Sequence, residues 1–417
     1  MGLALPRWFS VRARARPVCT ARKRWTAEAR AVRTSPWRAL SYDLRVNAEA
    51  HPGEPRRALE TLGGSVVHPD ALGIKEFSTY ALVIDARTAH EYREDHVPGA
   101  INLPVVDDAE FAEVGIAHAR DPHAAYLVGA AYVAKNLATH IRDHISKCRP
   151  GDRILVYCFR GGKRSRAWVD TLRGIGFETD VIEGGWKRYR SWVRDGLASL
   201  APRFEYRVLS GLTGCGKTRL LHALAHAGHQ VLDLEGLASH RGSLLGALPG
   251  DPQPSQKMFD SLLLDRLRRF DVARPVWVEA ESRKIGNIQL PPELLDAMRK
   301  TSHLQLSVPM DERVRLLRED YAHLADNPMA MVERLLPLKS LVGGEELALW
   351  QSLAEDGQVD ELCRRVLQYH YDPSYRRSRQ RSHSESGTII ELPAMDPASL
   401  ANAAAELTMR FGHCTAR

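Results

Sequence analysis

Residues 56–200 contain several short apolar runs and, between the second and third of them, one long segment whose apolar positions recur at helical spacing. The long segment begins at Asp121 and Pro122, a capping acid followed by a proline at the first helical position, and its pattern continues to Ile145. The short runs predict buried strands with their turns, and they lie at residues 80–85, 96–104, 154–157 and 180–185. Strands that alternate with helices predict an α/β domain, in which helices cover both faces of a parallel sheet.

The same alternation continues in residues 203–384, which we expect to form a second α/β domain. A helix is expected over 219–228, where Gly228 ends it, and another over 311–324, in a helical C-terminal part. The predicted strands cover residues 205–210, 231–235, 275–279 and 304–308. We assign residues 385–417 to a C-terminal tail.

The composition of the 417 residues, 44% hydrophobic and 26% charged, is that of a globular protein. It excludes a wholly disordered or collagen-like chain. No run of about 18 apolar residues is present, so we expect no membrane span. Six cysteines are too few for a disulfide framework, and without a secretory signal they predict a cytoplasmic protein.

The formal net charge of +7 is concentrated at the N-terminus. Residues 1–40 carry ten of the 58 Lys and Arg residues and only Glu28 as an acid, which leaves a net charge of −2 for the remainder. We therefore treat residues 1–55 as a basic extension. It is open whether this is an organelle transit peptide, a disordered arm that attracts phosphates, or upstream sequence read from an earlier start codon.

Cys158 is the first candidate catalytic residue. It follows the predicted strand 154–157 and precedes a basic, glycine-rich loop that leads into a helix. Open α/β sheets place their sites at such strand ends, and the loop N–H groups with the helix dipole would favour a thiolate or hold an oxyanion. An inert buried cysteine is the alternative, but an apolar core would not accept so much charge. The residues assigned to the anion loop are Arg160, Gly161, Gly162, Arg164 and Ser165.

Residues 211–218 carry the pattern G-x-x-x-x-G-K-T between a predicted strand and a predicted helix. In that context backbone N–H groups cradle a diphosphate, Lys217 neutralises it, and Thr218 binds Mg²⁺ if a metal is present. The diphosphate-binding residues are expected to be Gly211, Gly214, Gly216, Lys217 and Thr218.

Four acidic residues follow the strands next to this loop and are candidates for positioning a metal ion or water. They are Asp233, Glu235, Glu279 and Glu281. Solvated strand ends are an equally good explanation for them, so no metal site is assigned.

The first domain resembles the rhodanese family on residues 83–87, 97–104 and the Cys158 loop. This resemblance implies that Cys158 carries sulfur or selenium. Sulfur-transferring rhodaneses have a shorter loop, whereas the Cys-x5-Arg spacing from Cys158 to Arg164 is similar to that of rhodanese-fold and tyrosine phosphatases. The loop is therefore expected to hold a donor that bears a phosphate.

A rhodanese-like domain followed by a phosphate-loop domain resembles the tRNA 2-selenouridine synthase family. The motifs that carry the resemblance are residues 158–165, 211–218, 233–243, 279–286 and 371–375. It implies a transferase that replaces the sulfur of wobble 2-thiouridine in tRNA with selenium from selenophosphate. It also implies that a geranyl group from geranyl diphosphate is first placed on that sulfur. The implied partners are tRNA and an enzyme that supplies selenophosphate.

Binding of the tRNA is assigned to cations that would contact phosphates and to aromatic rings that would stack on a flipped-out base. The principal candidates are Arg241, Arg283, Lys284, Tyr371 and Tyr375, and further candidates are Lys187, Arg188, Arg190, His240 and residues 376–379. Three other functions stay open: a sulfurtransferase coupled to an ATPase, a phosphatase that uses the Cys-x5-Arg loop, and a non-catalytic tRNA-binding module.

Overall fold

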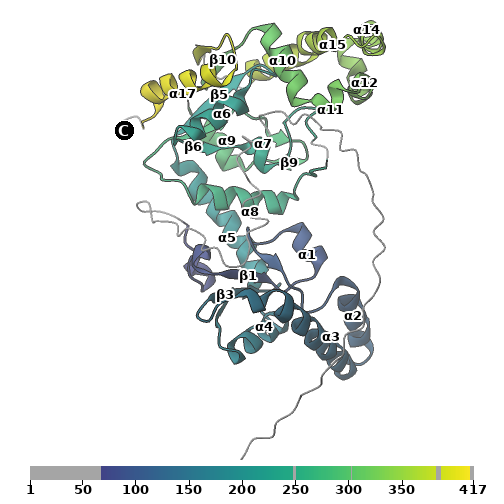
Figure 1. Cartoon of the computed structure of the whole chain (residues 1–417), viewed down its shortest axis with the longest axis vertical. Coiled ribbons are helices and arrows are strands. Elements are labelled where there is room, and N and C mark those ends of the chain that lie inside the picture. The colour runs from purple at the N-terminus through teal and green to yellow at the C-terminus, as the bar shows by residue number, and fades with distance from the viewer. Residues whose placement is uncertain (1–66, 248–249, 302, 382–386, 414–417) are drawn as a thin grey trace, which may run out of the picture. The chain divides into compact units, whose positions relative to one another are not determined.

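The computed structural model describes residues 67–247, 250–301, 303–381 and 387–413, and for residues 378–381 only the backbone (Figure 1). The expectations for residues 1–55, and the cysteines at 19 and 414, fall outside this part of the chain. The described residues belong to one compact unit that contains two parallel sheets. None of its described helices is both long and apolar enough to cross a membrane.

The first sheet has the strand order β2-β1-β3-β4, and every neighbouring pair is parallel. Its central strands are buried almost throughout, as expected for a parallel sheet covered on both faces. The strands are β1 (Leu82–Asp85), β2 (Ile101–Asn102), β3 (Arg153–Tyr157) and β4 (Glu178–Val181).

The apolar pattern predicted α3 and α4 but not the other described helices of the first domain, α1, α2 and α5. Of these, α2 begins at a capping box in which Asp107 and Glu110 bond each other's backbone N–H groups. It pairs with α3 to form a helical hairpin. The helices are α1 (Ala89–Glu94), α2 (Asp108–Arg120), α3 (Pro122–Asp143), α4 (Lys163–Gly174) and α5 (Gly185–Leu200).

The second sheet has the parallel order β11-β10-β5-β7-β6, with the phosphate loop at the carboxyl end of its central strand. The strands are β5 (Tyr206–Gly211), β6 (Gln230–Leu232), β7 (Val276–Glu279), β10 (His303–Ser307) and β11 (Thr388–Glu391), and β8 (Lys284–Ile285) and β9 (Ile288–Gln289) form a separate hairpin. The assignment of residues 385–417 to a tail needs correction, because β11 pairs with β10 and α17 (Pro397–Phe411) packs on α6 (Lys217–His226).

The remaining helices of the second domain surround the sheet or form the helical C-terminal part. The latter has its own hydrophobic core, which includes Leu335, Trp350 and Leu362. These helices are α7 (Leu234–Leu237), α8 (Gln256–Leu267), α9 (Pro292–Arg299), α10 (Met310–Asp320), α11 (Ala322–Ala325), α12 (Pro328–Leu335), α13 (Lys339–Val342), α14 (Gly344–Glu355), α15 (Val359–Val366) and α16 (Asp372–Arg381). Short 3₁₀ turns cover Pro69–Leu72, Phe77–Thr79, Ile145–Lys147, Ala201–Arg203 and Leu336–Leu338, and a π turn covers Leu367–Tyr371.

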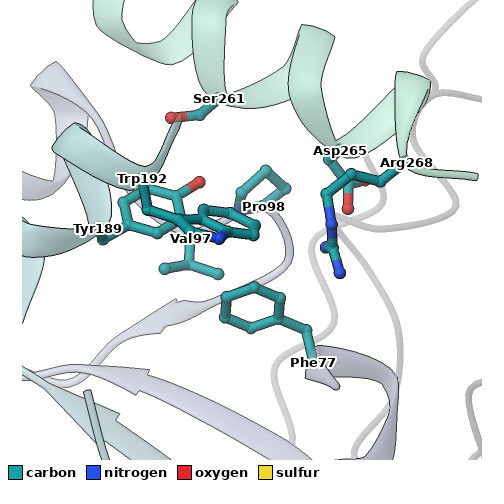
Figure 2. A pocket seen from close by; sticks show the side chains of 8 residues that line it. All are labelled: Phe77, Val97, Pro98, Tyr189, Trp192, Ser261, Asp265 and Arg268. Carbon is teal, nitrogen blue, oxygen red and sulfur yellow. The ribbon is translucent and has the colours of Figure 1, made fainter. Parts of the chain in front are cut away.

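The two domains join where α5 packs against α8 (Figure 1). One hydrophobic cluster runs through both domains at this seam. Figure 2 shows the aromatic rings of Phe77 and Trp192 on one side and Asp265 and Arg268 of α8 on the other, around a cavity of about 10 Å³. A space of this size holds about one water molecule, so the seam is closely packed.

Asp95 is the polar centre of the seam. It is fully buried, and its carboxylate accepts hydrogen bonds from Trp186 Nε1 of α5 and from the Ser261 hydroxyl of α8, each at 2.8 Å. The Arg190 guanidinium lies 3.6 Å from the same carboxylate and also binds Asp260 at 2.9 Å. A buried charge with this many partners fixes the angle between the two helices.

Candidate active site

Cys158 lies directly after β3 and is buried. Its Sγ accepts a hydrogen bond from the Ser165 hydroxyl at 2.8 Å. The helix α4 begins at Lys163, with Gly162 as its N-cap. The strand, cysteine loop and helix therefore follow one another as the sequence predicted, and Ser165 offers a donor to negative charge on the sulfur.

The Cys158 loop packs against the start of α5. The N–H of Trp186 donates to the Cys158 carbonyl at 2.8 Å, and the Trp186 ring stacks on Phe159 with centroids 5.5 Å apart. Gly185 has φ 61°, and a Cβ built there would lie 2.2 Å from the Cys158 carbonyl oxygen. Glycine is therefore required at this position, because any side chain would displace the loop.

The two arginines of the loop have different surroundings. Arg164 is partly buried and forms a bidentate ion pair with Glu91 of α1, in which Nη2 lies 3.2 Å from Oε1. Arg160 is exposed and has no carboxylate partner among the residues that the structure describes. Since Glu91 already binds the Arg164 guanidinium, Arg160 is the loop cation better placed to meet an incoming anion.

The phosphate loop has the backbone that its glycines predict. Gly211, Gly214 and Gly216 all have positive φ, and Gly216 is the N-cap of α6. The Lys217 amine lies 3.5 Å from the Gly211 carbonyl, and the Gly211 N–H donates to the Tyr375 hydroxyl at 3.0 Å. The glycine-rich loop thus leads into the N-terminus of α6 with Lys217 at its first position, which is the arrangement that binds a diphosphate in phosphate loops.

Three of the four candidate acids gather around Lys217 and Thr218. The Thr218 hydroxyl lies 3.0 Å from Glu279 Oε2 and 3.4 Å from Glu235 Oε2. Glu281 is close enough to Lys217 and to Glu235 to influence their charge. Within the part of the chain that the structure describes, no group of three or more His, Cys, Asp and Glu side chains is arranged to hold a metal ion.

Burial changes the protonation of this cluster. It raises the pKa of Glu235 to about 8 and that of Glu281 to about 7, and the neighbouring glutamates add to both effects. The pKa of Glu279 is also raised well above its ordinary value, again mainly by burial. Burial alone would lower the pKa of Lys217, but Cys215 and the three glutamates outweigh it, and the net direction is upward. Lys217 therefore keeps its charge while the glutamates share protons at neutral pH.

Asp233 is near enough to Glu235 and Glu279 to help raise their pKa values, but its own hydrogen bonds are with other groups. Its carboxylate caps α7 by accepting the Gly236 N–H at 2.7 Å, and its second oxygen lies 2.9 Å from His222 Nε2. These contacts account for Asp233 as a structural residue.

Some of the predicted tRNA contacts are exposed to solvent, and others are buried or already bind other residues of the chain. Arg283 and Lys284 are exposed at the β8–β9 hairpin, whereas Tyr371 is buried and Arg241 binds the backbone of Asp320 and lies 5.2 Å from the Tyr321 ring centroid. Tyr375 contacts the phosphate loop rather than solvent alone. The expectation for Arg190 does not fit the structure, because this residue is buried in the seam with Asp95 and Asp260.

Of the further candidates, His240 is buried and accepts the Gly242 N–H, while Lys187 and Arg188 are exposed at the start of α5.

Sequence reasoning missed Glu91 and Asp95, which hold the Cys158 loop and the seam. Both lie in or directly after α1, a helix too short to give a periodic signal. The capping box at Asp107 and Glu110 was the available signal for α2.

Two family models match the chain. Residues 71–191 match the rhodanese-like domain, and residues 204–335 match the tRNA 2-selenouridine synthase AAA domain. These matches contain the Cys158 loop and the phosphate loop respectively.

Several curated relatives carry one name, tRNA 2-selenouridine synthase. The one from Nitrosomonas europaea is 34% identical over 279 residues, which cover 65% of this chain and 71% of the relative. Those from Aeromonas salmonicida and Hydrogenovibrio crunogenus are 38% and 31% identical and cover 58% and 72% of this chain, and 65% and 89% of their own lengths. The similarity therefore extends across both domains.

Proposed function

Because the chain belongs to the tRNA 2-selenouridine synthase family, we propose that it converts the wobble 2-thiouridine of cytoplasmic tRNA to 2-selenouridine. Selenophosphate supplies the selenium, and geranyl diphosphate first alkylates the sulfur. The observation that supports this division most strongly is the presence of two anion-binding loops in one compact unit, one at Cys158 and one at Lys217. An enzyme that makes selenophosphate would be the upstream partner.

The phosphate loop serves the first step. The thiocarbonyl sulfur of the uridine attacks C1 of the geranyl group, a C–S bond forms, and the C–O bond to the diphosphate breaks. The diphosphate leaves with the electron pair, and Lys217 and the loop N–H groups stabilise its added charge. Any Mg²⁺ would enter with the diphosphate, with the Thr218 hydroxyl as its protein ligand.

The Cys158 loop serves the second step. Alkylation has made the sulfur a better leaving group, so the selenium of selenophosphate can attack C2 of the base while the C–S bond breaks and geranylthiolate leaves. Water then attacks the phosphorus, the P–Se bond breaks and phosphate is released, which leaves the selenium on the base. Arg160 and the N-terminus of α4 would bind the phosphate of selenophosphate next to Cys158. Ser165 would hold the Cys158 sulfur in place by its hydrogen bond.

Nucleoside mass spectrometry of tRNA treated with both co-substrates tests this assignment. Lys217→Ala should lose geranylation by at least about 100-fold, the usual cost of removing a group that stabilises a leaving charge. Cys158→Ala should still form S-geranyl-2-thiouridine but no 2-selenouridine. Cys148→Ala, a half-buried cysteine away from both loops, is the matched control and should retain both products.

Other outcomes would favour the alternatives. ATP turnover that ignores geranyl diphosphate, with sulfur as the transferred atom, would support a sulfurtransferase coupled to an ATPase. Hydrolysis of an aryl phosphate that depends on Cys158 would support a phosphatase. Survival of both modified uridines in Lys217→Ala would refute the division between the two loops.

A further inference from the structure

The helical hairpin of α2 and α3 places two half-exposed aromatic rings beside the Cys158 loop. Phe111 of α2 and Tyr126 of α3 are each 50% exposed. The Lys163 amine lies 3.6 Å from the Tyr126 ring centroid, and the Arg164 guanidinium lies 5.2 Å from that of Phe111. Lys163 and Arg164 are the first two residues of α4, so both rings lie next to the helix that begins at the anion loop.

The hairpin has further exposed apolar side chains besides these two rings. Ile116 and Leu127 of the same hairpin are also largely exposed. Large apolar side chains that gather on a surface generally mark a binding site. We call the surface formed by Phe111, Tyr126 and Lys163 the hairpin platform.

The charges around the hairpin platform favour an anionic partner. Two acids of the hairpin have cationic partners, since Glu110 binds Lys135 and Asp108 lies 3.9 Å from Arg93, while Glu113 accepts the Tyr132 hydroxyl. Lys163 and Arg160, in contrast, have no carboxylate partner among the residues that the structure describes. The combination of aromatic faces with unpaired cations is typical of surfaces that bind single-stranded nucleic acid.

We propose that the hairpin platform binds unpaired nucleotides of the tRNA next to Cys158, with Phe111 and Tyr126 stacking on bases and Lys163 contacting phosphate. This inference rests on the proposed function for the identity of the RNA. RNA is favoured over a protein partner because the hairpin platform has aromatic rather than purely aliphatic side chains at its centre and lies next to the anion loop. The hairpin platform would hold the loop that contains the modified uridine while selenium is transferred.

Binding of a fluorescein-labelled anticodon stem–loop RNA to the full chain, measured by fluorescence anisotropy at fixed salt, tests the inference. Phe111→Ala and Tyr126→Ala should each weaken binding about 5- to 100-fold, the usual effect of losing one stacked base. Tyr126→Phe keeps the ring and should bind like the wild type. A fully paired RNA duplex of equal length should respond little to any of these changes.

Two controls separate the hairpin platform from general surface effects. Leu341→Ala removes an equally prominent apolar side chain, 63% exposed on α13, and should leave RNA binding unchanged. Lys163→Ala should reduce the salt dependence of stem–loop binding, because one phosphate contact is lost. Half-exposed side chains tolerate truncation, so the variants are expected to fold.

The outcome is informative whether or not the proposed reaction occurs. If both alanine variants bind the stem–loop as the wild type does, the inference is overturned, even where wild-type tRNA is selenated. If the wild type forms no modified uridine but the variants lose stem–loop binding, the proposed function fails and the hairpin platform stands. If the variants instead change only the oligomeric state in light scattering, the surface is an interface between copies of the chain and the inference is wrong.

Discussion

At the scale of single residues, the cluster around Lys217 shows how burial sets charge. Glu235, Glu279 and Glu281 lie too close together and too deep for all three to be ionised with only one lysine nearby. Protons on these carboxyls reduce the negative charge beside Lys217, which would favour the diphosphate that we propose as its ligand. The strand ends indicated the glutamates, but only their packing reveals that they share one lysine.

The shared protons predict how stability depends on pH. An acid whose pKa is higher in the folded chain than its ordinary 4.5 binds more protons when folded, so stability falls as pH rises between the two values. That window extends to about pH 7 for Glu281 and to about pH 8 for Glu235. Without metal or diphosphate, Glu235→Gln combined with Glu281→Gln should therefore gain several degrees in Tm relative to the wild type between pH 5 and pH 8.5. Differential scanning fluorimetry measures this difference.

The exposed Glu333 of α12 provides the control, because Glu333→Gln should leave the Tm difference from the wild type constant over the same range. A constant difference for the double variant would show that the two carboxyls are ionised throughout.

At the scale of elements, the sequence predicted the buried strands and several helices, but it missed α1 and α2 although each begins at a capping box. β1, β3, β5 and β7 are short apolar runs with little solvent contact, and α3 has both an Asp cap and a proline at its first position. β11 was missed because it is an edge strand with one buried residue, so its apolar signal is weak. Its pairing with β10 also joins segments far apart in the chain, which local pattern cannot reveal.

The helix α17 shows that the missed segment stabilises the second domain. Leu407 is fully buried against α6, whereas Met409 on the same helix is 77% exposed. Leu407→Ala should lower the free energy of unfolding by about 2–5 kcal/mol, from lost burial and the cavity left behind. Met409→Ala should change it by less than about 0.5 kcal/mol. Chemical denaturation monitored by circular dichroism compares the two, and equal effects would contradict the packing of α17.

At the scale of the whole molecule, the seam decides whether the two loops can serve one uridine. Cys158 is tied to α5 through Trp186, Trp186 donates to Asp95, and Asp95 accepts from Ser261 of α8. A chain of direct contacts thus connects the Cys158 loop to the domain that contains Lys217. No sequence pattern marks Asp95, because its side-chain partners come from two distant elements, α5 and α8.

Asp95→Ala should weaken this connection strongly. It leaves the Trp186 and Ser261 donors without this acceptor and removes one of the two carboxylates beside the buried Arg190, which keeps Asp260. Loss of one member of a buried ion pair lowers the free energy of unfolding by about 3–5 kcal/mol. Because Asp260 still pairs with Arg190, we expect the lower end of this range, about 3 kcal/mol. The neighbouring Glu94 crosses the same seam to Lys257 but is 47% exposed, so Glu94→Ala should cost no more than about 1 kcal/mol.

In calorimetry the wild type should unfold in one transition, because the hydrophobic cluster is continuous across the seam. Asp95→Ala should lower or split that transition while Glu94→Ala leaves it single, and equal behaviour of the two variants would show that the domains are joined by the apolar cluster alone.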